Sequence, residues 1–463
     1  MKNTIRIISI LLTLVFCFLI AACSFAPGAE DSGGLMNGSP IFGDAAGKPD
    51  ADGATPPVDY GADSGDSVAG GDSTDAMPEG VVDGETAEGG TPDEGNGTAG
   101  DDAMPIKPAG LITAGAWNDN EDYVYWQSLF IGGNENDGKF YSFTEGKSWG
   151  FDSQKRIKVT VKGSDGNAVC GSTVYAKDEN GMALFRAVTN SAGVAYLFAD
   201  EAVKAVTAES GAYAADAVAD SDEITITLSG YEEKKNVIDI MFVVDVTGSM
   251  GDELDYLKRE LSDVITRVSA VESGAIINLA LLFYRDVTDS ETYKYYDFTN
   301  VNSPSGLAAQ QAAINSQYAS GGGDYPEAVD GALQMALSAQ WSSSTSTKLI
   351  FHLLDAPPHS SQENKALYKS SVERAAEMGI RICPIICSGT DTLTEYLARE
   401  AAVYTGGTFI FITDDSGIGN PHHDPELPNV TVEALNSMLV RLIQGYYTGE
   451  FAPPVYWKAD TQK

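Results

Sequence analysis

The chain has 463 residues, and 66 Asp and Glu side chains against 29 Lys and Arg give it a formal net charge of -37. A chain of this length is expected to contain more than one domain. The charge argues against a nucleic-acid partner, because phosphate binding needs a basic face.

The first 22 residues have the pattern of a secretory signal. Lys2 and Arg6 precede the apolar run 7–20, which is short for a membrane span. The small residues directly before Cys23 resemble a bacterial lipobox, in which that cysteine is lipidated and becomes the mature amino terminus. We therefore expect Cys23 to anchor the protein to the cell membrane, with its mass on the extracytoplasmic side. An ordinary signal peptide with an incidental cysteine is the alternative.

Residues 23–105 predict a disordered acidic linker. Gly, Asp, Glu, Ala, Ser, Thr and Pro dominate, and Lys48 is the only basic side chain between residues 24 and 105. Such a composition cannot bury a core. As a flexible coil of about 80 residues, the linker would separate its ends by roughly 50 Å and lift the folded part away from the membrane.

Residues 106–154 form an aromatic-rich segment that has two interpretations. Flat rings could make a carbohydrate-binding platform, or they could pack against the neighbouring domains. We favour packing, because a short segment needs large apolar side chains to dock. The aromatic residues include Trp117, Tyr123, Tyr125, Trp126, Phe130, Phe140, Tyr141 and Trp149.

Residues 155–232 predict a small all-β sandwich. Ile157, Val159 and Val161 alternate with polar neighbours, as in a strand with one buried face. Turn signals follow at residues 165–166, 180–181 and 192–193, ahead of a last strand at 224–228. Residues 165–174 and 189–195 resemble the carboxypeptidase-regulatory-like sandwich modules of surface proteins, which implies a spacer or a weak binder.

Three cysteines lie beyond the amino-terminal region. Cys383 and Cys387 are four residues apart on one expected strand, about 13 Å from each other, which is too far for a disulfide. With Cys170 they make an odd number of thiols. We expect all three to be unpaired and buried.

Residues 236–448 alternate between apolar strands and amphipathic helices, which predicts a doubly wound, mostly parallel α/β sheet. The expected strands are 237–244, 276–283, 293–298, 349–354, 380–386 and 409–412, of which the third is a polar edge strand. The expected helices cover 254–268, 307–318, 326–339, 362–378, 392–403 and 435–443. Residues 449–463 form a carboxyl-terminal tail.

Oxygen-bearing side chains follow the first of these strands. Asp245, Thr247 and Ser249 lie between the apolar run 237–244 and the next helix. In an open α/β sheet, ligands bind beyond the carboxyl ends of the strands. Oxygen ligands suit hard cations, so we expect Mg²⁺ as the cofactor, with Mn²⁺ or Ca²⁺ as alternatives. A turn that only caps the following helix is the simpler interpretation.

Two more segments extend this pattern. Residues 321–327 read Gly-Gly-Gly-Asp-Tyr-Pro-Glu before a helix, and residues 353–359 read Leu-Leu-Asp-Ala-Pro-Pro-His after an apolar strand. With Asp-x-Thr-x-Ser at 245–249, these segments resemble, in order, the metal-ion-dependent adhesion site of von Willebrand factor type A domains. The resemblance covers residues 236–448 and implies their α/β fold and a divalent-cation site.

The resemblance also implies roles for five residues. Thr247 and Ser249 would coordinate the cation through their hydroxyls, and Asp245 and Asp355 would orient bound waters. Asp324 stands where many family members have a threonine. Its added negative charge should hold the cation more tightly and weaken the attraction of the cation for an acidic group of a partner.

These features together imply a membrane-anchored protein that binds another macromolecule through a divalent cation, in adhesion or complex assembly. The partner would be a protein or another surface component, contacted through an acidic group. We expect no enzymatic activity, since the sequence lacks a recognisable nucleophile motif or nucleotide site. Two alternatives remain: a non-catalytic scaffold or sensor subunit with a structural metal, and a metal-assisted enzyme.

Overall fold

The computed structural model describes residues 112–132, 138–144, 149–199, 202–271, 274–416, 421–425, 427–428 and 430–457. The expected signal sequence, the lipidated Cys23 and the acidic linker lie outside the described residues. Within the described ranges, no helix combines the length and the apolar character needed to span a bilayer.

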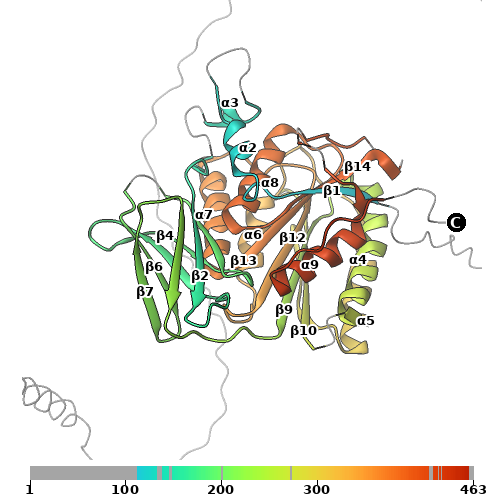
Figure 1. The fold of residues 1–463 in the computed structure, drawn as a ribbon. Helices are drawn as coiled ribbons and strands as arrows, with labels where there is room; N and C mark the ends of the chain where they lie inside the picture. Colours follow the sequence, from blue (N-terminus) through green and yellow to red (C-terminus); the bar gives the residue numbers. More distant parts are fainter. Residues whose placement is uncertain are drawn as a thin grey trace, which may run out of the picture. The chain divides into compact units, whose positions relative to one another are not determined.

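A mixed sheet of eight strands forms the centre of the described part (Figure 1). Five neighbouring strands run parallel, in the order β10, β9, β12, β13, β14, and antiparallel strands flank them on both sides. From edge to edge the strands are β11 (Tyr293–Asn300), β10 (Ile276–Tyr284), β9 (Val237–Asp245), β12 (Thr347–Leu354), β13 (Ile380–Ile386), β14 (Phe409–Thr413), β1 (Thr113–Trp117) and β15 (Glu433–Ala434). The large, mostly parallel sheet confirms the expected α/β class.

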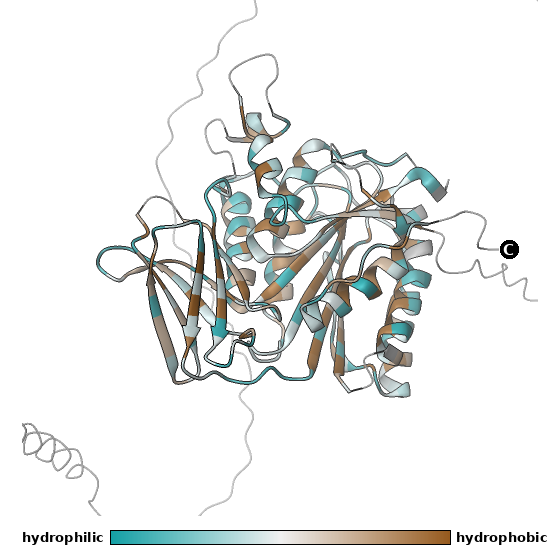
Figure 2. Ribbon diagram, viewed as in Figure 1, coloured by the Kyte–Doolittle hydropathy of each residue, from teal (hydrophilic) through white to brown (hydrophobic). Residues whose placement is uncertain are grey.

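Helices cover both faces of this sheet, and consecutive residues of β9 point to opposite layers. Met241 and Val243 belong to one hydrophobic cluster, and Ile240 and Phe242 belong to the other. The first cluster includes α6 (Val329–Leu337), α7 (Gln362–Met378) and α8 (Thr392–Thr405); the second includes α4 (Gly251–Val271), α5 (Pro304–Asn315) and α9 (Leu435–Thr448). Burial on both faces explains why the central strands are mostly apolar in Figure 2. Charged residues interrupt them at Asp239 of β9, Lys348 of β12 and Arg381 of β13.

Local signals explain the ends of α7 and α8. The side chains of Ser361 and Asp391 cap the first turns by accepting hydrogen bonds from backbone N–H groups. Each helix then ends at a glycine with a left-handed conformation, Gly379 at φ 71° and Gly406 at φ 68°. Because these signals are local, the expected range 362–378 matches α7. By contrast, α5 begins three residues before the expected 307, at Pro304.

Residues 157–228 form two small sheets. One has three strands, β5 (Val194–Leu197), β2 (Ile157–Gly163) and β8 (Glu223–Leu228); the other has four, β4 (Ala183–Val188), β3 (Thr173–Lys177), β6 (Ala205–Ser210) and β7 (Tyr213–Val218). The expected turns at Gly166, Gly181 and Gly193 all have positive φ angles. Apolar side chains of both sheets join the cluster that contains α7 and α8. Arg381 of β13 connects them further by donating to the carbonyl of Val188.

The aromatic-rich segment is packed into the fold, as expected. It contributes β1 to the central sheet, where β1 pairs with β14 and β15, and it continues through the short helices α2 (Tyr123–Ser128) and α3 (Tyr141–Thr144). Trp126 and Phe140 are completely buried, and Phe143 stacks on Tyr396 of α8. These buried rings are not free to bind a sugar.

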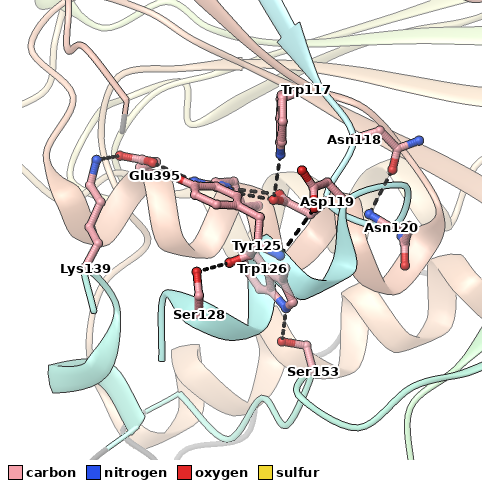
Figure 3. Close-up of polar contacts among 12 residues, drawn as sticks. Trp117, Asn118, Asp119, Asn120, Tyr125, Trp126, Ser128, Lys139, Ser153 and Glu395 are labelled. Carbon is pink, nitrogen blue, oxygen red and sulfur yellow. Dashed lines mark hydrogen bonds and ion pairs between the residues drawn. The ribbon is translucent and has the colours of Figure 1, made fainter. Parts of the chain in front are cut away.

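A buried ionic cluster holds this segment against α8 (Figure 3). Arg399 of α8 is fully buried and donates to both carboxylate oxygens of Asp119 and to Glu395. Trp117 also donates to Asp119, at 3.0 Å, and Lys139 pairs with Glu395 at 2.7 Å. The segment is therefore fixed by charge as well as by apolar packing.

The cysteines agree with the sequence-based expectation. Cys170, Cys383 and Cys387 are all free and buried. Burial raises the pKa of each thiol above its ordinary value, which disfavours the reactive thiolate.

Candidate metal centre

The parallel register brings the loops after β9, β10 and β12 to one edge of the sheet. At the carboxyl end of β9, Asp245 lies opposite Tyr284 of β10, and Val244 lies opposite Leu353 of β12. The loops that follow these strands therefore emerge side by side. Asp245 and Asp355, which are 110 positions apart in the sequence, come from two of these loops.

The first loop places two hydroxyls beside a buried carboxylate. Asp245 is completely buried, and its Oδ1 accepts from the backbone N–H of Thr247 at 2.8 Å and from the Thr247 hydroxyl at 2.7 Å. The hydroxyls of Thr247 and Ser249 lie 3.2 Å apart. The loop thus contains a local turn between Asp245 and Thr247, which engages only one oxygen of Asp245. The side chain of Thr247, at the N-cap position, does not cap the short helix Gly248–Met250 that follows.

Several buried carboxylate oxygens near this loop lack a partner among the described residues. They are Asp245 Oδ2, Glu253 Oε2, Glu327 Oε2 and Asp355 Oδ1. Each of these four residues is at most 4% exposed. A buried carboxylate without a donor or a counter-charge is costly, and a cation would remove that cost. The donor set of carboxylates and hydroxyls fits a hard divalent cation.

The pKa values of the carboxyl groups at this edge of the sheet are raised. Burial, and then the charge of Asp355, raise the pKa of Asp245 above the ordinary range. Burial also raises the pKa of Asp355, although hydrogen bonding from Ser249 opposes that change. For Glu327, burial and the neighbouring carboxylates of Asp245 and Asp286 raise the pKa to about 9. Burial and mutual repulsion therefore favour the neutral forms of these carboxyl groups, and a cation bound here would favour their ionised forms.

The glycine-rich segment, residues 321–327, is joined by backbone hydrogen bonds to the loop after β9 and to the loop after β12. Gly248 donates to the carbonyl of Gly321 at 3.2 Å, and Glu327 donates to the carbonyl of Pro357 at 3.0 Å. The hydroxyl of Tyr325 donates to the carbonyl of Asp355 at 3.3 Å. The segment therefore lies beside the loops that carry Asp245 and Asp355.

The five residues expected at the site differ in their burial. Asp245, Thr247 and Asp355 are buried, and Ser249 is exposed but within reach of Thr247. Asp324 is also exposed, and no hydrogen bond or ion pair joins its carboxylate to another described residue. Glu327, in the same glycine-rich segment, is the buried one. The motif at residues 321–327 includes Glu327, for which the sequence predicts no role.

A histidine lies at the margin of the site. His359 Nε2 is 2.6 Å from Oδ1 of Asp286, whose other oxygen accepts from the Thr288 hydroxyl at 2.8 Å.

No group of three or more His, Cys, Asp and Glu side chains in the described ranges has a metal-binding arrangement. A cation at this edge would therefore depend on the hydroxyls of Thr247 and Ser249 as well as on the carboxylates.

Comparison with known families agrees with this architecture. Residues 239–406 match the family model of the von Willebrand factor A domain. The matched range begins in β9 and includes the three loops described above. This part of the chain is therefore a von Willebrand factor A domain.

Two curated proteins are similar over part of the chain. An alpha-protein kinase, vwkA of Dictyostelium discoideum, is 26% identical over 142 residues, which are 31% of this chain and 22% of the kinase. An ariadne-like RING finger protein of Acanthamoeba polyphaga mimivirus is 30% identical over 131 residues, 27% of this chain and 12% of that protein. The chain thus spans less than a quarter of either relative.

Solved structures give remote, partial matches. The pilus adhesin SpaC from Lactobacillus rhamnosus GG aligns with 53% of this chain and 33% of its own, at 10% identity and a TM-score of 0.35. The protein BatB from Bacteroides thetaiotaomicron aligns with 38% of this chain and 89% of its own, at 12% identity and a TM-score of 0.27. Similarity at this level carries no information about function.

Proposed function

We propose that this protein binds another macromolecule through a divalent cation held at the edge of its von Willebrand factor A domain. The observation that carries the proposal is the meeting of partnerless buried oxygens of Asp245 and Asp355 with the hydroxyls of Thr247 and Ser249. Mg²⁺ is the favoured ion, because all of these donors are hard oxygens. The partner would be a protein or another surface macromolecule.

The role is one of binding rather than catalysis, and the protein acts outside the cytoplasm. Support for the location comes from the sequence, where Cys23 follows a signal-like apolar run and the linker 24–105 would extend the folded part away from a membrane. A lipid-anchored position suits a protein that gathers partners at a surface.

A non-catalytic scaffold with a structural cation is the second candidate. The hydrogen bonds between the loops favour this candidate. The N–H of Gly248 donates to the carbonyl of Gly321 at 3.2 Å, and the N–H of Ser320 donates to the carbonyl of Val246 at 3.0 Å. The loops therefore form one structural unit, which a bound ion would reinforce. In that case the ion would stabilise the edge without contacting a partner. Pull-down of surface proteins in Mg²⁺ and in EDTA separates the two functions, since only the first loses its partner in EDTA.

The cation itself is tested by thermal unfolding of the purified protein in increasing Mg²⁺ or Mn²⁺. An ion that binds only the folded state stabilises it by about 2.7 kcal/mol at 100 times its dissociation constant. We expect the midpoint to rise by several degrees and Asp245→Ala to remove the rise. An unchanged midpoint at millimolar concentrations of either ion would contradict the proposal.

A further inference from the structure

The segment 321–327 brings one buried carboxylate to the edge of the sheet, and it is not the one that the motif suggests. Relying on the cation site proposed above, we propose that Glu327, and not Asp324, is the carboxylate that this segment contributes to the site. Glu327 would thus take the place that a neutral threonine hydroxyl has in many members of the family.

Burial and proximity distinguish the two residues. Glu327 is 4% exposed, and its Oε2 has no partner among the described residues, whereas Asp324 is exposed. A Cβ atom at Gly322 would lie 3.0 Å from Oε1 of Glu327 and 3.4 Å from Cβ of Thr247. The carboxylate of Glu327 and the side chain of Thr247 therefore flank the same glycine.

The backbone explains why Glu327 points inward. Its N–H donates to the carbonyl of Pro357 at 3.0 Å, and it forms a parallel β-bridge with Pro358. These contacts fix Glu327 beside the loop that carries Asp355. Gly322 has a φ of +76°, a conformation that favours glycine and that lets the chain turn closely around Thr247. Asp324 is left on the exposed part of the segment.

An acidic residue here changes what the site can accept. When ionised, Asp245, Asp355 and Glu327 place three negative charges at this edge, and a divalent cation neutralises only two of them. A carboxylate of a partner would therefore meet net negative charge at the site. We therefore infer that the partner presents a neutral oxygen, such as a hydroxyl or an amide carbonyl, and not a carboxylate.

Isothermal titration of the full-length protein with Mg²⁺ and Mn²⁺ tests the role of Glu327. We expect Glu327→Gln to weaken cation binding at least tenfold, and Asp324→Asn, the matched control, to change it less than twofold. The reverse order, or equal affinity of Glu327→Gln and the wild type, would overturn the inference while leaving the cation site in place. If the wild type binds neither ion, the proposed site itself fails.

Glu327→Thr provides a second variant and tests the ligand chemistry. It leaves a neutral hydroxyl in the segment, and acetate serves as the carboxylate probe in the Mg²⁺ titration. We expect acetate to raise the apparent Mg²⁺ affinity of Glu327→Thr and to leave that of the wild type unchanged. An increase in the wild type as well would contradict the charge argument. Circular dichroism of both variants checks that they are folded.

Discussion

Glu400 illustrates how one side chain in this protein is controlled by its surroundings. It is fully buried in α8, where Oε1 accepts from the hydroxyl of Ser153 at 2.9 Å and Oε2 has no partner among the described residues. Burial raises its pKa to about 8, against the lowering effect of the hydrogen bond from Ser153. Near neutral pH the folded state therefore keeps this side chain protonated.

We predict that Glu400 makes the protein less stable as the pH rises from 5 to 8. The unfolded chain loses the proton near the ordinary pKa of glutamate, so the folded state binds more protons in this window. The free energy of unfolding then falls by up to about 1.4 kcal/mol per pH unit. Glu400→Gln, which resembles the neutral form, should reduce the fall. Urea unfolding at pH 5, 6, 7 and 8 measures this, and equal slopes for both proteins would refute it.

Residue-scale chemistry at the sheet edge was only partly readable from the sequence. The spacing of Asp245, Thr247 and Ser249 indicated their proximity, because a short turn after a strand holds its side chains together. The distinction between Asp324 and Glu327 was not readable, because both are acidic residues in one glycine-rich segment. It depends on the hydrogen bond of Glu327 to Pro357, which lies 30 positions later.

At the scale of elements, β1 and α8 depend on each other. β1 extends the central sheet beyond β14, and the residues that follow it cover α8. Gly115 allows this pairing, since a Cβ atom there would lie 2.3 Å from the ring of Phe411. The ionic cluster of Arg399, Asp119 and Glu395 then closes the contact away from water. The aromatic-rich segment is thus an integral part of the α/β layer.

We predict that Asp119→Asn destabilises this contact strongly. Removing one partner of a buried ion pair typically costs about 3–5 kcal/mol, because the other charge stays buried. Urea unfolding should show a loss of this order, and limited proteolysis should cut more rapidly between residues 112 and 157.

Two further variants serve as controls for this prediction. Glu121→Gln, at a nearby exposed position, should change the free energy of unfolding by less than about 0.5 kcal/mol. Arg399→Met in the Asp119→Asn background should cost less than Arg399→Met alone, since the pair is already broken. Additive losses in the double variant would contradict the coupling.

At the scale of the whole molecule, the expected order is a lipid anchor, an acidic linker and then the folded part. The described residues supply no membrane-spanning helix. The proposed membrane attachment rests on the amino-terminal sequence around Cys23. The energy of attachment would come from acyl chains on Cys23, because the linker is too polar to insert.

We predict that Cys23→Ser shifts the protein from the membrane fraction to the soluble fraction. Cys17→Ser, within the apolar run that would be removed, is the matched control and should leave the protein on the membrane. Fractionation followed by immunoblotting measures the distribution. A Cys23→Ser protein that is cleaved at its signal and still sediments with membranes would argue against lipidation.

Features that depend on neighbouring residues were predictable from the sequence alone. Apolar runs, helical periodicity and capping residues are local, so α7 and β13 have the bounds that the pattern predicts. The same holds for the turn that follows Asp245. The strands β6 and β7 were not predicted, because their alanine-rich sequences carry little periodic contrast.

Contacts between segments far apart in the sequence became visible only in the folded chain. Thr113 of β1 pairs with Thr413 of β14 across 300 positions, and no local pattern specifies such a partner. The same is true of Glu327, whose inward direction is set by the loop that carries Asp355. Pairing between strands and the burial of a charge are properties of the assembled sheet, since they depend on the shape and charge of surfaces that exist only after folding.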